Sequence, residues 1–290
     1  MSRSARSVPA LVSLFLAVAL PGLAAPPASA AEPDTAPAHL RDRGPGVPTS
    51  MFGTYVRKGE LLVYPFAEWY SDGNLEYKPS ELGYGSDVDY RGRYTASEQL
   101  LFLGYGFAED WAIELEGAII SAELNKASDD PTAVPEEIEE AGLGDVEAQV
   151  RWRFLEEKGS RPMAFTYFET VFPLQKQRRM IGTSDWEFKL GAGITRGYRW
   201  GTMTFRAAGE YVRDERKFEA GEYAIEYLRR VSPSWSVYAG IEGNQVDEIT
   251  LITEAQWRIA PRAVLKVNNG WGLTPNATDF APEAGILFSF

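Results

Sequence analysis

Residues 145–154 read DVEAQVRWRF, and every second side chain of this stretch is apolar. Val146, Val150 and Trp152 share one parity, whereas Glu147 and Arg151 share the other. Successive side chains of a β-strand point to opposite faces of the sheet, so this stretch predicts a strand with one apolar and one ionic face. Burying so many charges in a dry protein core would cost much free energy, so the ionic face is expected to be wet.

The same period-two alternation recurs along residues 60–290, and no helical periodicity is sustained there. The alternating segments predict about 12 strands. Phase is ambiguous in the second and fifth segments, where Met163 shares its parity with Glu169. The expected ranges are 60–71, 91–107, 110–123, 143–154, 162–173, 185–197, 202–212, 221–230, 235–244, 247–259, 263–272 and 281–290.

The connections between these segments alternate between long and tight, with one exception at Gln245-Val246. Tight connections such as Ala108-Glu109 and Ala260-Pro261-Arg262 carry turn residues. A membrane barrel with both chain ends in the periplasm has short periplasmic turns and longer outer loops. The connection lengths therefore favour an antiparallel up-and-down barrel.

Alternation also fits a soluble β-sandwich, in which the apolar face points inward. Two further features favour the membrane barrel. The last segment carries Ile286, Phe288 and Phe290 on one face, which resembles the terminal aromatic signal read by the assembly machinery of bacterial outer-membrane barrels. The eight tryptophans fall near predicted strand ends, where amphipathic rings would meet the lipid–water boundary. We therefore expect an all-β transmembrane barrel, a monomer among outer-membrane lipid and lipopolysaccharide.

The first residues have the pattern of an export signal. Arg3 and Arg6 precede an apolar run from residue 8 to residue 25, and Ala28-Ser29-Ala30 follows as a small-residue cleavage site. This pattern predicts a signal peptide over residues 1–30. Residues 31–59 are rich in Pro, Ala and charge in their first part, and we expect a flexible periplasmic leader that could enter the lumen as a plug.

Composition excludes several classes of function. The chain has no cysteine and a single histidine, His39, which precedes the first predicted barrel strand. Thiol chemistry, zinc fingers and disulfide scaffolds are thereby excluded, and a nucleophile–histidine pair has only His39 to use. We therefore predict no enzymatic activity and no cofactor. The formal charge of -12, which becomes -14 without Arg3 and Arg6, argues against a nucleic-acid partner.

Gly142-Leu143-Gly144-Asp145, opening a strand that ends in Arg151-Trp152-Arg153-Phe154, resembles a recurring feature of the barrel family named for the MetA pathway of phenol degradation. The resemblance implies a barrel over residues 50–290. It also implies a transporter of apolar or aromatic compounds, since members of that family are described as outer-membrane transporters of such molecules.

The ionic faces of the predicted strands supply the candidate lumen residues. One interpretation is a lattice of ion pairs that closes the interior, and the other is a polar pathway whose acidic bias favours cations or neutral solutes. The leading functional hypothesis is passive uptake of small, apolar or aromatic molecules, and the alternative is a non-transporting structural or surface-interaction barrel. The candidates are Glu114, Glu116, Glu147, Arg151, Arg153, Glu187, Lys189, Arg206, Glu210, Glu226, Arg230, Glu242, Glu254 and Arg258.

Two predicted outer loops carry concentrated charge. The first is acidic and has enough carboxylates for a calcium ion, but it lacks EF-hand spacing, so we expect a solvated loop. The second is basic and suits the phosphates of lipopolysaccharide. The acidic residues are Asp129, Asp130, Glu136, Glu137, Glu139 and Glu140, and the basic ones are Lys176, Arg178 and Arg179.

Overall fold

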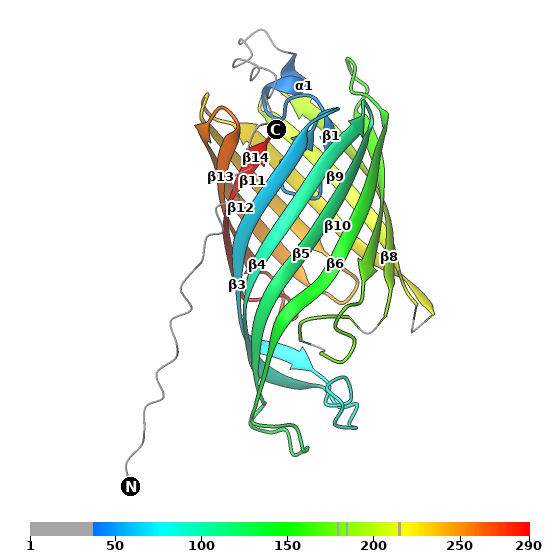
Figure 1. Cartoon of the computed structure of the whole chain (residues 1–290), viewed down its shortest axis with the longest axis vertical. Helices are drawn as coiled ribbons and strands as arrows, with labels where there is room; N and C mark the ends of the chain where they lie inside the picture. Colours follow the sequence, from blue (N-terminus) through cyan, green and yellow to red (C-terminus); the bar gives the residue numbers. More distant parts are fainter. Residues whose placement is uncertain (1–36, 179, 184, 214–215) are drawn as a thin grey trace.

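The computed structural model describes residues 37–178, 180–183, 185–213 and 216–290. The expected signal peptide, the first part of the expected leader and Arg179 lie outside these residues. Twelve antiparallel strands within the described ranges form a closed barrel, in which the last strand pairs with the first (Figure 1). The strands are β3 (Leu61–Tyr77), β4 (Tyr90–Ala108), β5 (Trp111–Asn125), β6 (Glu137–Leu155), β7 (Met163–Phe172), β8 (Glu187–Tyr198), β9 (Gly201–Val212), β10 (Lys217–Arg230), β11 (Trp235–Gly243), β12 (Ile249–Ala260), β13 (Ala263–Gly272) and β14 (Phe280–Ser289). The predicted fold class is confirmed.

The connections sort onto the two ends of the barrel. Residues 109–110, 156–162, 199–200, 231–234 and 261–262 turn at one end, which we call the short-turn end. Residues 78–89, 126–136, 173–186, 213–216, 244–248 and 273–279 connect strands at the other, the long-loop end. Figure 1 shows the C-terminus at the short-turn end, where Leu61 and Phe290 exchange two backbone hydrogen bonds.

Three strands are longer than alternation predicted. β3, β6 and β10 extend to Tyr77, Glu137 and Lys217, all toward the long-loop end. Glu137 and Glu139 still pair in register with β5, although charge there occupies successive positions of the strand. Backbone pairing can continue beyond the bilayer, where water reaches both faces, so alternation ends before the strand does.

The burial of side chains is inverted relative to a soluble sheet. On β5, Ile113 and Leu115 are 41% and 44% exposed, whereas Glu114 between them is 3% exposed. Trp111 and Trp152 stack on the outside with ring centroids 5.3 Å apart, as do Trp235 and Trp257 at 5.5 Å. Apolar groups on the outer wall and charges within are the arrangement of a barrel immersed in lipid.

The two strands of ambiguous phase have mixed inner faces. On β7, Met163, Phe165 and Tyr167 face inward together with Glu169, whereas Phe168 is exposed. The Arg151 guanidinium lies 4.8 Å from the Tyr167 ring centroid and 5.9 Å from that of Phe165. These aromatic rings lie against a buried cation and not against lipid, which is why an inward face looks apolar in the sequence.

Residues preceding the barrel are folded back against its inner wall. They comprise helix α1 (Ala38–Arg41) and strands β1 (Val47–Pro48) and β2 (Tyr55–Val56), which pair with each other. We call residues 47–56 the N-terminal hairpin. Val47 and Val56 are almost fully buried against inward-facing residues of β3 and β4 such as Tyr64 and Phe102. Within the described residues, no helix is long and apolar enough to cross a membrane.

Candidate functional site

The lumen is the candidate site, and the N-terminal hairpin crosses it. On one side Ser50 donates hydrogen bonds from its backbone N–H and its hydroxyl to Glu114 Oε2 on β5. Arg151 and Arg153 on β6 donate to the carbonyl oxygens of Pro48 and Gly46, at 3.2 and 3.0 Å. The wall thus satisfies backbone groups that the short hairpin leaves open.

The opposite wall holds the tip of the same hairpin. Lys266 Nζ on β13 donates to the carbonyl oxygen of Phe52 at 2.9 Å, and it lies 3.4 Å from Glu254. The Phe52 ring stacks on Tyr238 of β11 with centroids 5.0 Å apart. Because β5 and β6 lie across the closed sheet from β11 and β13, these contacts fix the hairpin between two walls.

The segment before the hairpin is anchored at the short-turn end. Arg43 Nη2 and Glu157 Oε2 form a buried ion pair at 3.0 Å, and Glu157 also accepts a hydrogen bond from the backbone N–H of Gly197. Asp42 accepts a hydrogen bond from the backbone N–H of Arg230 at 2.9 Å. This mouth of the barrel is therefore occupied by protein.

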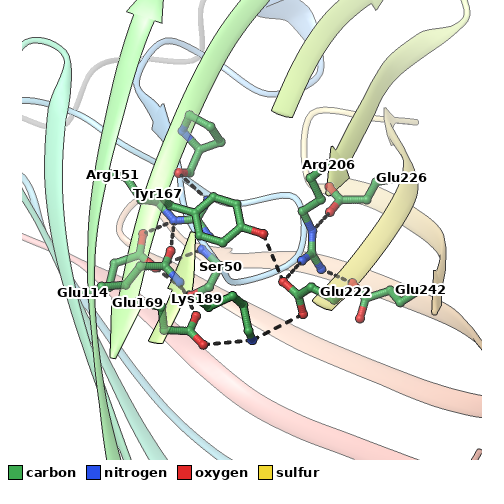
Figure 2. A network of polar contacts seen from close by, with 12 residues as sticks. Ser50, Glu114, Arg151, Tyr167, Glu169, Lys189, Arg206, Glu222, Glu226 and Glu242 are labelled. Atoms are coloured by element: carbon green, nitrogen blue, oxygen red, sulfur yellow. Dashed lines mark hydrogen bonds and ion pairs between the residues drawn. The ribbon is translucent and has the colours of Figure 1, made fainter. Parts of the chain in front are cut away.

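Figure 2 shows a network of ion pairs on the wall beside the hairpin. Arg206 donates to three glutamates, Glu222, Glu226 and Glu242, with Nε 2.8 Å from Glu226. Lys189 lies 2.9 Å from Glu169 and 3.7 Å from Glu222. Four carboxylates thus share two cations, one from β8 and one from β9, so adding a cation or removing an acid changes several ion pairs at once.

A bulge on β10 supplies one acid of this network. Pairing with β9 shifts register between Ala220 and Tyr223, so one extra residue enters the strand there. Phe218 lies on the outside before the bulge and Tyr223 after it, while Glu222 turns to Arg206. Bulges often re-aim side chains in this way.

The wall formed by β14, β3, β4, β5 and β6 is acidic. Glu283 is in register with Glu68, and Glu68 with Glu98. Glu116 and Glu147 are also directly opposite each other. Like charges in opposite positions destabilise a sheet, so this arrangement costs stability unless solutes or solvent compensate it.

The hairpin separates cavities of opposite charge. Toward the long loops lies a cavity of about 520 Å³, whose described lining has eight glutamates and one lysine, Lys266. A smaller space of about 200 Å³ adjoins it beside the ion-pair network. Toward the short turns lies a cavity of about 420 Å³, lined among the described residues by eight arginines and lysines but only two acids, Asp42 and Glu60. We call these the acidic and the basic cavity.

The predicted lumen residues distribute over these spaces. Glu114, Glu116, Glu147, Arg151, Lys189, Arg206 and Glu242 line the acidic cavity or the space beside it, and Arg230 and Arg258 line the basic cavity. Four others contact or face residues nearby in the sheet. Arg153 forms an ion pair with Asp110, Glu226 with Arg206, and Glu254 with Lys266. Glu210 is in register with Lys189. Glu187 is half-buried on β8 and is in register with Val171 of β7.

Sequence reasoning missed several members of the site. Glu98 and Glu169 lie in the two segments of ambiguous phase, and Glu222 lies at the bulge of β10. For β3 and β14, parity alone could have found the missed residues, because they alternate with aromatic or small residues. The missed residues are Glu68, Glu98, Glu169, Glu222, Lys266 and Glu283.

The charged loops are engaged within the protein. Carboxylate oxygens of Glu123, Glu137 and Glu139 lie within 4.8 Å of one another near the acidic loop. In the basic loop, Lys176 lies 3.2 Å from Asp185, and Arg178 donates to the carbonyl oxygen of Ala141. That loop also buries Ile181 against inward-facing residues of β4 and β5, so it folds over the long-loop mouth.

No family model and no curated protein matches this chain. Among solved structures, it is similar to an outer membrane channel from Pseudomonas putida F1, with 12% identity, a TM-score of 0.58, and coverage of 80% of this chain and 96% of the channel. It is also similar to the KdgM porin in complex with oligogalacturonate, with 9% identity, a TM-score of 0.50, and coverage of 79% and 99%. The translocator domain of the autotransporter NalP from Neisseria meningitidis has 11% identity, a TM-score of 0.50, and coverage of 81% and 90%. At such low identity these likenesses establish the outer-membrane type of barrel fold.

Proposed function

We propose that this chain is an outer-membrane channel for the passive passage of small solutes, with the N-terminal hairpin as its internal barrier. The observation that carries the proposal is the pair of cavities on either side of the hairpin, of about 520 and 420 Å³. A barrel that served only as a scaffold would gain from filling these spaces with side chains. The outer-membrane barrels among the structural likenesses support this location.

The lining of the acidic cavity favours cations and polar neutral solutes. Apolar side chains, including Phe66, Leu100 and Ile252, also line this cavity. Small aromatic molecules, which the family resemblance implies, would find their apolar contacts there and their polar contacts at the surrounding glutamates. The negative potential of the surrounding glutamates would repel anions from this cavity.

A structural barrel without transport is the second candidate, and one observation favours it. Glu114 and Arg151 form an ion pair at 3.1 Å with both side chains only 3% exposed. Ser50 donates to Glu114, and Arg151 donates to the carbonyl oxygen of Pro48, so the hairpin and the wall are joined by buried contacts. Such contacts could keep the lumen closed permanently.

Conductance separates the two candidates. The folded chain in planar bilayers is compared with a variant that lacks residues 31–56, which removes the hairpin and leaves β3–β14. We expect low or flickering conductance for the full chain and steady ohmic conductance for the variant. A folded, inserted variant that passes neither ions nor small neutral solutes in liposome swelling would refute a transport function.

A further inference from the structure

The basic cavity contains guanidinium groups that the other described residues leave without a negative partner. Of its cations, Arg43 pairs with Glu157, Lys266 with Glu254, and Lys58 with Glu109. Within the described residues, the guanidinium groups of Arg57 and Arg258 have no hydrogen-bond acceptor and no carboxylate partner.

Arg230 completes a group of three. Its guanidinium donates only to the backbone carbonyl oxygens of Ser232 and Pro233, at 3.3 and 3.4 Å, and these neutral acceptors leave its charge in place. The positive charges of Arg230 and Arg57 both act on Arg258, so the three groups repel one another. They come from β10, β12 and the segment before β3, and the fold alone brings them together.

The acids of the cavity do not relieve this repulsion. Glu60 is bonded to the backbone N–H of Arg57 and to the hydroxyl of Ser289. Asp42 accepts the backbone N–H of Arg230 and lies 3.7 Å from Arg229. Three guanidinium groups therefore line one open space of about 420 Å³ without a carboxylate partner among the described residues.

We propose that Arg57, Arg230 and Arg258 form a binding site for a small oxyanion, either phosphate or the carboxylate of a small solute. Guanidinium groups present planar, paired donors that match both kinds of oxyanion and keep their charge at every accessible pH. The site lies on the short-turn side of the hairpin, and Gly53, Thr54 and Tyr55 line the same cavity. The bound anion would therefore sit directly under the barrier of the proposed channel, although its binding does not require that the barrel conducts.

The test is calorimetric titration of the folded full chain in detergent with inorganic phosphate and, separately, with acetate, at constant ionic strength. We expect saturable binding of at least one anion, and the comparison shows which oxyanion geometry the site prefers. Arg258→Gln should lower that affinity at least tenfold. Lys58→Gln is the matched control, because it removes one positive charge from the same cavity but not from the group of three, and it should change the affinity less than threefold.

A further variant keeps the proposal falsifiable if Arg258→Gln does not fold. Arg258→Lys retains the charge but loses the paired donors, and it should still weaken binding severalfold. Heat-modifiable migration on gels verifies folding of each variant. The proposal is overturned if neither anion binds the wild-type chain, or if Lys58→Gln weakens binding as much as the Arg258 variants, since that would indicate only a diffuse positive field.

Discussion

The Glu114 carboxylate receives two hydrogen bonds from Ser50, one from the backbone N–H at 3.0 Å and one from the hydroxyl at 2.7 Å. It also lies 3.1 Å from the Arg151 guanidinium, which itself donates to the carbonyl oxygen of Pro48. One wall acid therefore holds the hairpin directly at Ser50 and, through Arg151, at Pro48. If the hairpin is the barrier of a channel, this acid is one of the residues that hold it closed.

Glu114→Gln should loosen the hairpin. A hydrogen bond to a charged group contributes about 1.5–3 kcal/mol, so its loss should raise the undocked population roughly 10- to 150-fold. The native chain has no cysteine, so Met51→Cys at the hairpin tip gives a single thiol to measure with an impermeant maleimide. Glu187→Gln, on the wall but without a hydrogen bond to the hairpin, is the control. Equal labelling rates in the two variants would show that Glu114 does not secure the hairpin.

Val150→Arg should impair insertion of the barrel. Val150 is 37% exposed on the outer wall, where an arginine near the bilayer midplane costs about 2–4 kcal/mol. Glu147→Arg, three residues away on the same strand, places the same side chain in the acidic cavity and should insert normally. The folded fraction in lipid vesicles across a urea series measures both. Similar losses for the two variants would contradict the assignment of the faces.

Glu116→Gln should make the barrel more stable and less selective for cations. It removes one of two like charges that stand opposite each other, a change of roughly 0.2–1 kcal/mol in favour of the fold. Glu226→Gln is the matched control, because Glu226 lies 2.8 Å from the Arg206 guanidinium and its loss removes an attraction instead.

Both quantities can be measured on one set of proteins. Urea unfolding in vesicles gives the stability, and the reversal potential in a KCl gradient, with residues 31–56 removed, gives the selectivity. The expected order of stability is Glu116→Gln above wild type above Glu226→Gln. A rise in cation selectivity for Glu116→Gln would be incompatible with an acidic permeation path.

Gly197→Ala should release the segment before the hairpin while leaving the barrel closed. A Cβ at this position would overlap the backbone of His39, which cannot move aside as a side chain can. We expect faster trypsin cleavage at Arg41 and Arg43 and an unchanged heat-modifiable shift of the barrel. Gly117→Ala, whose Cβ would meet Val146 at an ordinary 3.5 Å, is the control strand glycine. Unchanged cleavage in Gly197→Ala would mean that α1 is not held against β8.

Sequence patterning predicted the barrel because lipid enforces a strict rule on the outer face. Val150 and Trp152 must be apolar, and this requirement repeats on each strand that spans the membrane. Glu222 escaped the pattern because the bulge after Ala220 inverts the parity of β10, and the one sequence signal of that bulge is Gly221. Glu169 escaped because Phe165 and Tyr167 beside it pack on Arg151 rather than on lipid.

The hairpin could not be derived from alternation. β1 and β2 contain two residues each, too few to show a period, and they are held by wall side chains that lie far away in the sequence. Ser50 and Glu114 are an example, separated by 64 positions. The opposite charges of the two cavities could not be predicted from the sequence either, because they depend on which side of the hairpin each wall residue lies.

The chain continues from the hairpin into the barrel through residues 57–60, and the backbone N–H of Gly59 donates to the carbonyl oxygen of Gly106 at this junction. Undocking is therefore an intramolecular event, in which the released segment remains at a local concentration on the order of millimolar. The released hairpin cannot be lost by dilution, so re-docking of the same hairpin ends each opening. Such a tether favours brief, self-terminating openings whose frequency is set by docking strength and is independent of how much of the protein the membrane contains.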